Sequence, residues 1–374
     1  MKRLIAVWRR ERNRSAGPPD RLTSPEVKEV AAGIRQLSLG LTRERSLAGA
    51  KYMDDPRLLG AYLLFYWPVS YAQARQVFGE LTSRPRAVLD LGSGPGPLAF
   101  AALDAGAAEV MCADRSQRAL TLGRELAAEG EEALASRLWD PERGGHLPEG
   151  TFDVITIGHL LNELYGKGSD AVKRRAELLE SALQQVKKGG SVVVLEPALR
   201  ETSRALLLVR DVLVARGYAV RAPCLWRHAC PALVKESDWC HAERAWRMPP
   251  VVEELAHAAS LHKEALKMSY LILAPKGEPW SEPPPGRVFR IVSEPLEGKG
   301  RQRYIGCGPE GRLGLALQEK HRTEANAAFF RLRRGDVVRV TETEEKGDGI
   351  ALTERSEAAV IALVGRPLPR QDES

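Results

Sequence analysis

Apolar residues recur at helical spacing in the first part of the chain and gather into short runs after it. Between Pro25 and Glu80 they fall every three or four positions, which predicts two or three helices with a break at Pro68. Short apolar runs then alternate with helical segments, and they predict strands at 87–91, 109–114, 152–157, 191–195, 218–222 and 269–273. Strands that alternate with helices indicate a parallel sheet covered on both faces.

The pattern changes again beyond residue 275. The segment 275–285 is rich in proline and polar residues, which is typical of a linker. Short apolar runs at 287–292, 337–341 and 349–352 follow, separated by glycine-rich turns, and they predict a small β-barrel-like domain. The tail after Pro367 is predicted to be disordered. The expected units are a loose basic arm at 1–23, a helical region at 24–82, an α/β domain at 83–275 with a cysteine-rich insert at 223–247, and the β-domain at 286–366.

Composition narrows the classes of protein that the chain could belong to. Its 374 residues, 44% hydrophobic and 28% charged, are typical of a globular protein of two or three domains. No apolar run is long enough to cross a membrane, and the five-residue apolar stretch near the N-terminus is too short for a signal peptide. Few cysteines without a secretion signal indicate a reducing compartment. The net charge, 55 minus 49 or +6, permits nucleic-acid binding without requiring it.

A glycine-rich loop follows the first predicted strand of the α/β domain. Asp90 lies near the end of that strand, and Gly92, Gly94 and Gly96 follow it, where a sharp turn brings the backbone close to a ligand. Asp114 ends the second strand, and its carboxylate can accept hydrogen bonds from both hydroxyls of a ribose. The G-x-G-x-G spacing suits S-adenosylmethionine better than a dinucleotide, which needs G-x-G-x-x-G. The alternative is a tight turn with no ligand.

Three polar residues follow the predicted strand at 152–157. His159, Asn162 and Glu163 lie where strand ends of such sheets face the ligand, so they are candidates to contact cofactor or substrate. An ordinary polar helix start explains them equally well. The segment has neither the Asn-Pro-Pro-Tyr type motif of amino-methylating enzymes nor the Pro-Cys nucleophile of cytosine-5 methylation. The sequence therefore leaves the catalytic residue unassigned.

Four of the five cysteines lie in the second half of the chain, separated by gaps of five, nine and 66 residues: Cys224, Cys230, Cys240 and Cys307. These gaps differ from the C-x₂-C pairs of zinc ribbons. Thiolates favour zinc or iron–sulfur clusters, and wide, irregular gaps suit a cluster of several irons better than one ion. Zinc with three cysteines and His228 or His241 is the alternative, and free buried cysteines are a third interpretation. Cys112 lies inside a predicted strand and belongs to that third class.

Basic residues in the last domain indicate contact with RNA. Lys299–Arg303 and Arg331–Arg334 are two such runs, and Phe329 and Phe330 precede the second. Aromatic residues beside cationic ones are typical of RNA-binding surfaces, although an ordinary solvated face has similar charges. We predict that RNA contacts this domain together with the basic N-terminal arm.

Three stretches resemble the methyltransferase-like family of the small ribosomal subunit, which includes mitochondrial small-subunit protein 22, methyltransferase-like protein 17 and bacterial relatives. They are 61–71, the glycine loop at 88–96, and the cysteine segment at 222–231 with Trp239–His241. The resemblance spans roughly residues 50–345. It implies an α/β fold, a Rossmann-like class I methyltransferase sheet with an N-terminal helical region and a C-terminal β-domain.

The same resemblance implies a function. It implies S-adenosylmethionine at Asp90, Gly92, Gly94, Gly96, Asp114, His159 and Asn162, and a [4Fe–4S] cluster on Cys224, Cys230, Cys240 and Cys307. The partner would be the small ribosomal subunit and its RNA, with no membrane. We expect a methyltransferase of small-subunit ribosomal RNA that acts in ribosome assembly. The alternative is an assembly factor that binds the cofactor without catalysis. The bacterial cytoplasm is the expected location, with the mitochondrial matrix as the alternative.

Overall fold

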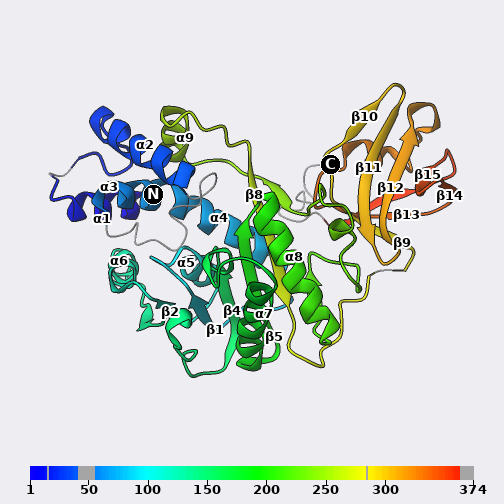
Figure 1. Ribbon diagram of the computed structural model, residues 1–374. Coiled ribbons are helices and arrows are strands. Elements are labelled where there is room, and N and C mark those ends of the chain that lie inside the picture. Colours follow the sequence, from blue (N-terminus) through cyan, green and yellow to red (C-terminus); the bar gives the residue numbers. More distant parts are fainter. Residues whose placement is uncertain (15–16, 41–54, 284, 363–374) are drawn as a thin grey trace.

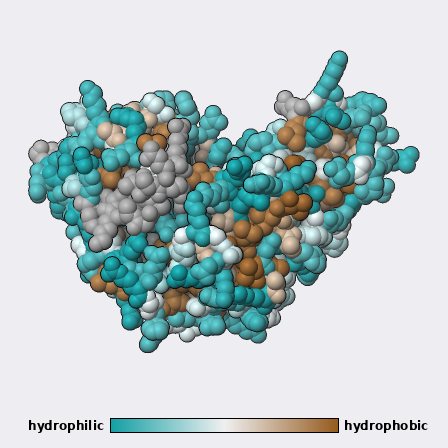
Figure 2. Space-filling model, in the orientation of Figure 1, coloured by the Kyte–Doolittle hydropathy of each residue, from teal (hydrophilic) through white to brown (hydrophobic). Residues whose placement is uncertain are grey.

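The computed structural model describes residues 1–14, 17–40, 55–283 and 285–362. Helices form one end of the molecule, an α/β sheet forms its centre, and a β-domain forms the other end (Figure 1). The space-filling view shows a notch between the two lobes, with hydrophilic residues over most of the visible surface and a hydrophobic band below the notch (Figure 2). No helix among the described residues has the length and apolar character needed to cross a membrane.

The N-terminal segment is a packed helix and not the loose basic arm that we predicted at 1–23. Helix α1 (Lys2–Glu11) buries one face that contains Leu4, Ile5 and Trp8. Its Arg9 pairs with Glu26 of helix α2 (Ser24–Ser38) at 2.8 Å. Basic residues at the helix surface hid an apolar stripe that runs from Leu4 to Trp8. The arginines of this segment therefore belong largely to the fold, and only part of their charge faces solvent.

Pro68 does not break the helical path as the sequence suggested. Helix α3 (Pro56–Ala61) continues through a π-helical turn, η3 (Tyr62–Tyr66), into helix α4 (Trp67–Phe78). Pro68 stands directly after the π-helical turn, where the regular i→i−4 hydrogen bonds are interrupted, so the N–H that proline lacks costs less there than in a regular helix interior. The π-helical turn widens the path just before Pro68, and such turns are common at functional sites.

The central sheet is mixed, whereas the sequence predicted a parallel one. Its order is β3-β2-β1-β4-β5-β8-β6, with β7 paired to β8. Strands β1 to β5 are parallel, and β8 runs antiparallel to β5, β6 and β7. The bounds are Ala87–Leu91 (β1), Glu109–Asp114 (β2), Ala135–Leu138 (β3), Phe152–Gly158 (β4), Val186–Pro197 (β5), Val220–Ala222 (β6), Ala242–Ala245 (β7) and Ala265–Leu273 (β8).

Helices cover both faces of this sheet, because its strands are apolar on both sides. On β5, Val193 and Leu195 belong to one hydrophobic core, while Val192 and Val194 belong to the other. The first core also holds side chains of α1 to α4, so the helical region shares a core with the α/β domain. The remaining helices are α5 (Pro97–Asp104), α6 (Gln117–Ala128), α7 (Ser169–Gln184), α8 (Arg200–Ala215) and α9 (Pro250–Ala258).

The C-terminal domain is a second sheet with a separate core. The order is β14-β15-β12-β11-β9-β13-β16, with β10 paired to β11. Phe329, which we had considered for RNA contact, is fully buried in that core, so only Phe330 and the exposed arginines remain candidates. The bounds are Arg287–Ile291 (β9), Leu296–Gly298 (β10), Arg301–Gly308 (β11), Gly311–Gln318 (β12), Val337–Val340 (β13), Thr343–Lys346 (β14), Gly349–Leu352 (β15) and Ala358–Ala362 (β16). The predicted disordered tail lies outside the described residues.

A buried polar network joins the β-domain to the rest of the molecule. Glu80, just after α4, pairs with Arg290 of β9 at 3.0 Å and with Arg244 of β7 at 3.4 Å, and it also accepts a hydrogen bond from Tyr270 of β8. The backbone approaches closely here, since a Cβ added at Gly335 would lie 2.1 Å from an Arg244 nitrogen. One carboxylate therefore connects all three parts of the fold.

Candidate functional site

The glycine loop between β1 and α5 has the conformation that its sequence predicts. Gly92, Gly94 and Gly96 all have positive φ angles, of 67°, 53° and 82°. A side chain at Gly92 would collide with Leu160, since its Cβ would lie 2.8 Å from that residue. Gly92 and Gly94 line a large cavity, whereas Gly96 is the N-cap of α5 and does not line it. Two of the three glycines thus face a ligand space, and the third shapes the turn.

Asp90 fixes the loop from beneath. It is 1% exposed, and its carboxylate accepts hydrogen bonds from the Thr156 hydroxyl at 2.7 Å and from the backbone N–H of Ala99 at 3.1 Å. Burial raises the pKa of Asp90 to about 7. These contacts hold the start of α5 against β1 and β4. Asp90 therefore positions the loop, although it also reaches the cavity wall.

Asp114, at the end of β2, lies on the same wall. One carboxylate oxygen accepts the N–H of Gly94 and the other accepts the N–H of Ser116, each at 2.8 Å. Burial raises the pKa of this carboxyl group. Each carboxylate oxygen can accept a further hydrogen bond, so Asp114 can bind a ligand while it holds the loop. The structure brings Asp114 and the glycine loop together, as predicted.

The end of β4 forms the adjoining wall. His159 has a positive φ of 56°, and its Nε2 lies 3.2 Å from Oε1 of Gln73 on α4. Asn162 donates from its amide to the backbone oxygen of His159 at 2.7 Å. The buried Glu196 accepts the N–H groups of Leu161 and Asn162. Burial lowers the pKa of His159 to about 4, so its imidazole is neutral near pH 7.

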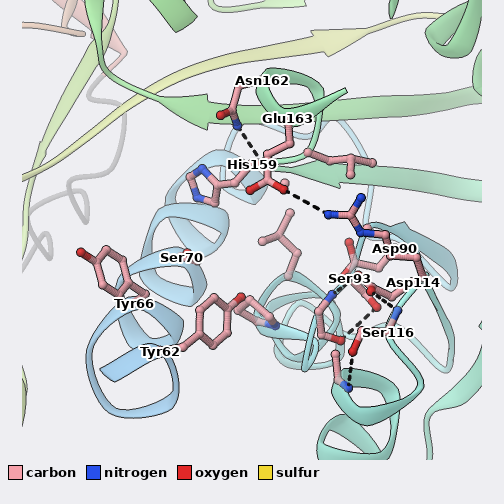
Figure 3. Close-up of a pocket in the computed structure, with 18 of the residues that line it drawn as sticks. Tyr62, Tyr66, Ser70, Asp90, Ser93, Asp114, Ser116, His159, Asn162 and Glu163 are labelled. Carbon is pink, nitrogen blue, oxygen red and sulfur yellow. Dashed lines mark hydrogen bonds and ion pairs between the residues drawn. The ribbon is translucent and has the colours of Figure 1, made fainter. Parts of the chain in front are cut away.

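The cavity enclosed by these walls measures about 940 Å³, near the upper end of the range for small-molecule pockets. Figure 3 shows Asp90, Ser93, Asp114 and Ser116 on one side and Tyr62, Tyr66, Ser70 and His159 on the other. Sequence reasoning named His159 but missed Tyr62, Tyr66 and Ser70, because the two tyrosines look like core residues of an amphipathic helix. It also missed Asp140, which follows the unpredicted strand β3. The cavity is large enough for a cofactor of nucleoside size with a substrate group beside it.

The four cysteines, which start far apart in the sequence, line one smaller cavity of about 70 Å³. Cys224 follows β6, Cys230 is the N-cap of the 3₁₀ helix η6 (Pro231–Leu233), and Cys240 precedes β7. Cys307 comes from β11, across the interface with the β-domain. Cys112 is buried inside β2, as predicted. Among the described residues no group of three or more His, Cys, Asp or Glu is arranged to hold a metal ion.

Burial and repulsion from neighbouring thiolates make Cys230, Cys240 and Cys307 weaker acids than a free thiol. Burial, then the neighbouring Cys224, raises the pKa of Cys230 to about 12 and that of Cys240 to about 11. Both causes raise the pKa of Cys307 as well. Of the two histidines named for the zinc alternative, His241 lines the cavity, but His228 does not. The Nε2 atom of His241 also lies 2.7 Å from Oε1 of Glu243, so this nitrogen already has a hydrogen-bond partner.

Fold and loop together define a class. When β7 is left out and the other seven strands are numbered in chain order, the order of the sheet is 3-2-1-4-5-7-6. The seventh strand in this numbering is β8, which is antiparallel to its neighbours, and a glycine-rich loop follows the first strand. This is the class I S-adenosylmethionine methyltransferase fold. The chain belongs to the family described as mitochondrial small ribosomal subunit Rsm22, whose sequence profile matches residues 59–349. The match confirms the resemblance and includes both the glycine loop and all four clustered cysteines.

Solved methyltransferase structures share the fold at a distance. A methyltransferase from Pyrococcus furiosus has a TM-score of 0.36 and 15% identity, over 55% of this chain and 83% of that one. TrmN from Thermus thermophilus has a TM-score of 0.36 and 21% identity, over 57% of this chain and 53% of that one. The ribosomal protein L11 methylase from Lactobacillus delbrueckii subsp. bulgaricus has a TM-score of 0.34 and 18% identity, over 55% of this chain and 77% of that one. No curated protein sequence matches this chain. The fold assignment rests on the strand order.

Proposed function

We propose that this protein is an S-adenosylmethionine-dependent methyltransferase of small-subunit ribosomal RNA that carries an iron–sulfur cluster. The observation that carries the proposal is the cavity at the carboxyl ends of β1, β2 and β4, which offers a cofactor wall and a second wall facing it. Membership in a small ribosomal subunit family supports the choice of substrate.

The cofactor wall fits S-adenosylmethionine. In this proposal Gly92 and Gly94 let the backbone approach the methionine part, and Asp114 accepts the ribose hydroxyls; all three residues line the cavity. Asp140, after β3, lies on the same cavity and is available to the base. When bound, the cofactor supplies an electrophilic methyl group on its sulfonium. The protein's part is to hold that group toward the opposite wall.

The opposite wall is the proposed acceptor site. Tyr62 and Tyr66, one helical turn apart, provide aromatic surfaces on which a base can stack. His159 is the candidate proton acceptor, since it is neutral and lines the cavity. If its Nε2 carries the proton shared with Gln73, Nδ1 is free to accept one from the substrate. A His159→Gln variant that keeps cofactor affinity but methylates at the wild-type rate would remove this role.

The cluster proposal rests on the chemistry of its donor set. Cys224, Cys230, Cys240 and Cys307 line one cavity whose wall contains no carboxylate, and four thiolates favour iron–sulfur or zinc over hard cations. Since Cys307 belongs to the β-domain, a metal bound there would fasten the two domains together. Its role would be structural. Zinc held by three cysteines and His241 is the alternative.

A second function is a non-catalytic assembly factor that binds the cofactor and RNA. The segment after β4, Gly158 to Leu164, lacks the catalytic motifs of amino- and cytosine-methylating enzymes, and that observation favours this reading. For the location, we keep the bacterial cytoplasm as the expectation. The family description favours the mitochondrial matrix alternative.

One experiment separates the two functions. Anaerobically purified protein is incubated with S-adenosylmethionine labelled in its methyl group and with small-subunit particles or their RNA. We expect calorimetric binding of the cofactor and incorporation of label into RNA. Binding without incorporation would favour the assembly factor. No binding by the wild-type chain would overturn both versions.

A further inference from the structure

The cysteine cavity is lined by cations on a wall that contains no acid. Besides the four cysteines, its wall includes the side chains of five arginines and no aspartate or glutamate: Arg210, Arg244, Arg290, Arg312 and Arg334. Guanidinium groups are costly to bury without compensating negative charge. Their carboxylate partners lie behind the wall. A cavity with this lining is complementary to a compact anion.

Unpartnered hydrogen-bond donors point to the same conclusion. The Nε atoms of Arg210, Arg244 and Arg290 are buried donors and have no hydrogen-bond partner. They are three of the ten buried side-chain atoms in this condition among the described residues. The Nδ1 atom of His241 is a fourth, but it is an acceptor in the neutral ring, since Nε2 donates to Glu243. All four residues line the cysteine cavity. Buried donors without partners are rare, and a concentration of them in one place indicates a missing acceptor.

The arginines are fixed from behind, so they cannot turn toward solvent. Arg210 is 1% exposed and is held by Asp211 at 2.6 Å and by the backbone oxygens of Trp226 and His228. Asp211 also accepts the N–H of Cys230 at 2.8 Å. One ion pair thus shapes the loop that carries the first two cysteines.

The β-domain supplies further arginines through its strand register. Cys307 of β11 lies opposite Arg290 of β9 and opposite Arg312 of β12. Arg290 is held by Glu80 at 3.0 Å, and Arg312 by Asp238 at 2.7 Å. The sheet therefore brings two anchored guanidinium groups to the two sides of the cysteine that crosses the domain boundary.

We propose that Arg210, Arg290 and Arg312 form a cationic cage that stabilises the anionic metal–thiolate group held by the four cysteines and raises its reduction potential. The inference rests on the proposed cluster. Positive charge close to the site favours thiolates over thiols and favours the reduced, more negative state of a cluster. A cavity of about 70 Å³ is too small for a nucleotide, so a compact anion is the fitting occupant.

The test compares charge-removing and charge-keeping variants of the full chain, purified without oxygen. Arg290→Gln and Arg312→Gln remove one charge each, and Arg290→Lys keeps it. Arg303→Gln is the matched control, because Arg303 is exposed on the same strand as Cys307. Iron and sulfide content, the midpoint potential and the rate of iron loss to a ferrous chelator are measured. Cofactor affinity and the unfolding temperature report whether each variant is folded.

We expect both glutamine variants to have a more negative midpoint potential and to lose iron several-fold faster, with Arg290→Lys closer to the wild type and Arg303→Gln unchanged. Wild-type potential and chelation rate in both folded glutamine variants would overturn the cage while leaving the cluster. If the wild type holds zinc, the chelation rate alone decides, with a zinc chelator. Wild-type protein without bound metal would refute the cluster and the cage together, while cofactor binding would still test the methyltransferase proposal.

Discussion

The two cavities of this protein differ most in the charges on their walls. The larger one, about 940 Å³, is lined by both signs, for example Asp114 and Glu163 on one side and Lys263 on another. In the smaller one, five arginines lie beside the thiols, and the wall contains no carboxylate. S-adenosylmethionine carries both signs, whereas a metal–thiolate group is anionic. The charges on each wall thus match those of the ligand proposed for it. The two sites differ more clearly in the charge of their walls than in their shape.

The origin of the two walls differs as well. The cofactor wall comes from adjacent strand ends of one sheet, as in other open α/β sheets. The cysteine wall combines residues from β7, β11 and the loop after β6, which belong to two domains. A ligand in the first cavity organises a local loop. A ligand in the second connects domains, so its loss has the larger consequence for stability.

The largest expected effect comes from removing a cysteine. Cys240→Ser should abolish stoichiometric metal and destabilise the whole chain by several kcal/mol, because metal-binding energy becomes folding energy, which lowers the unfolding temperature by roughly 10 °C. Metal analysis and thermal unfolding under anaerobic conditions measure this. Cys112→Ala is the control, since Cys112 is buried in β2 away from the cavity. It should keep its metal, and equal destabilisation of the two variants would count against a metal that joins the domains.

The second prediction concerns a site outside both cavities. The hydrogen bond from Arg9 lowers the pKa of Glu26 to about 2, against an ordinary value of 4.5. Because the pKa is lower in the folded state, the stabilisation is complete above about pH 4.5 and disappears as the pH falls toward 2. It amounts to about 2–3 kcal/mol.

A Glu26→Gln variant measures that contribution. Its unfolding free energy should be about 2–3 kcal/mol lower than that of the wild type at pH 7, and the gap should narrow as the pH falls below 4.5. Cofactor affinity and metal content should stay unchanged, because Glu26 lines neither cavity. A gap that is constant from pH 7 to pH 3 would contradict the attachment of α1 to α2 through this pair.

The third prediction addresses the cofactor wall. Asp114→Asn removes the charge of the carboxylate that accepts hydrogen bonds from Gly94 and Ser116 and that we propose binds the ribose. Affinity for S-adenosylmethionine should fall by about 1.5–3 kcal/mol, or roughly 10- to 100-fold, as measured by calorimetry. Glu109→Gln, at the exposed start of the same strand, is the control and should bind normally. Unchanged affinity in Asp114→Asn would move the cofactor elsewhere in the cavity.

Sequence reasoning succeeded where the signal is local. The glycine spacing of 92–96 and the carboxylate at Asp114 follow one another closely along the chain, and their strands are strongly apolar. It failed at β3 (Ala135–Leu138) because three of its four residues are exposed and its pattern resembles a loop. It failed at α1 because clustered arginines concealed a buried stripe.

The candidate sites were predictable only in part for the same reason. The cysteines could be named, since thiols are rare and chemically distinctive. The arginines could not, because Arg210, Arg290 and Arg312 are three of many cations and become neighbours only through strand register and domain packing. The proposed acceptor wall depends on the long-range contact between Gln73 of α4 and His159 after β4, which leaves no trace in the spacing of Tyr62, Tyr66 or Gln73.

The smallest expected effect lies at the exposed face of the β-domain. The helices around α1 and the β-domain lie at opposite ends of the molecule, so the single RNA surface that we predicted from the sequence would have to span the centre (Figure 1). The β-domain is the better candidate, because Arg301, Arg303, Arg331 and Arg333 are exposed on it.

Since phosphate contacts release counterions, binding to small-subunit RNA should weaken with salt. A double variant with Arg301→Gln and Arg303→Gln should bind this RNA about 1 kcal/mol more weakly. Its slope of log affinity against log salt concentration should be smaller by about 1–2. The matched pair Arg3→Gln with Arg10→Gln, on the exposed side of α1, should change neither. RNA affinity is measured by filter binding across a salt series. Equal losses of affinity in the two double variants would support a single RNA surface that extends from α1 to the β-domain.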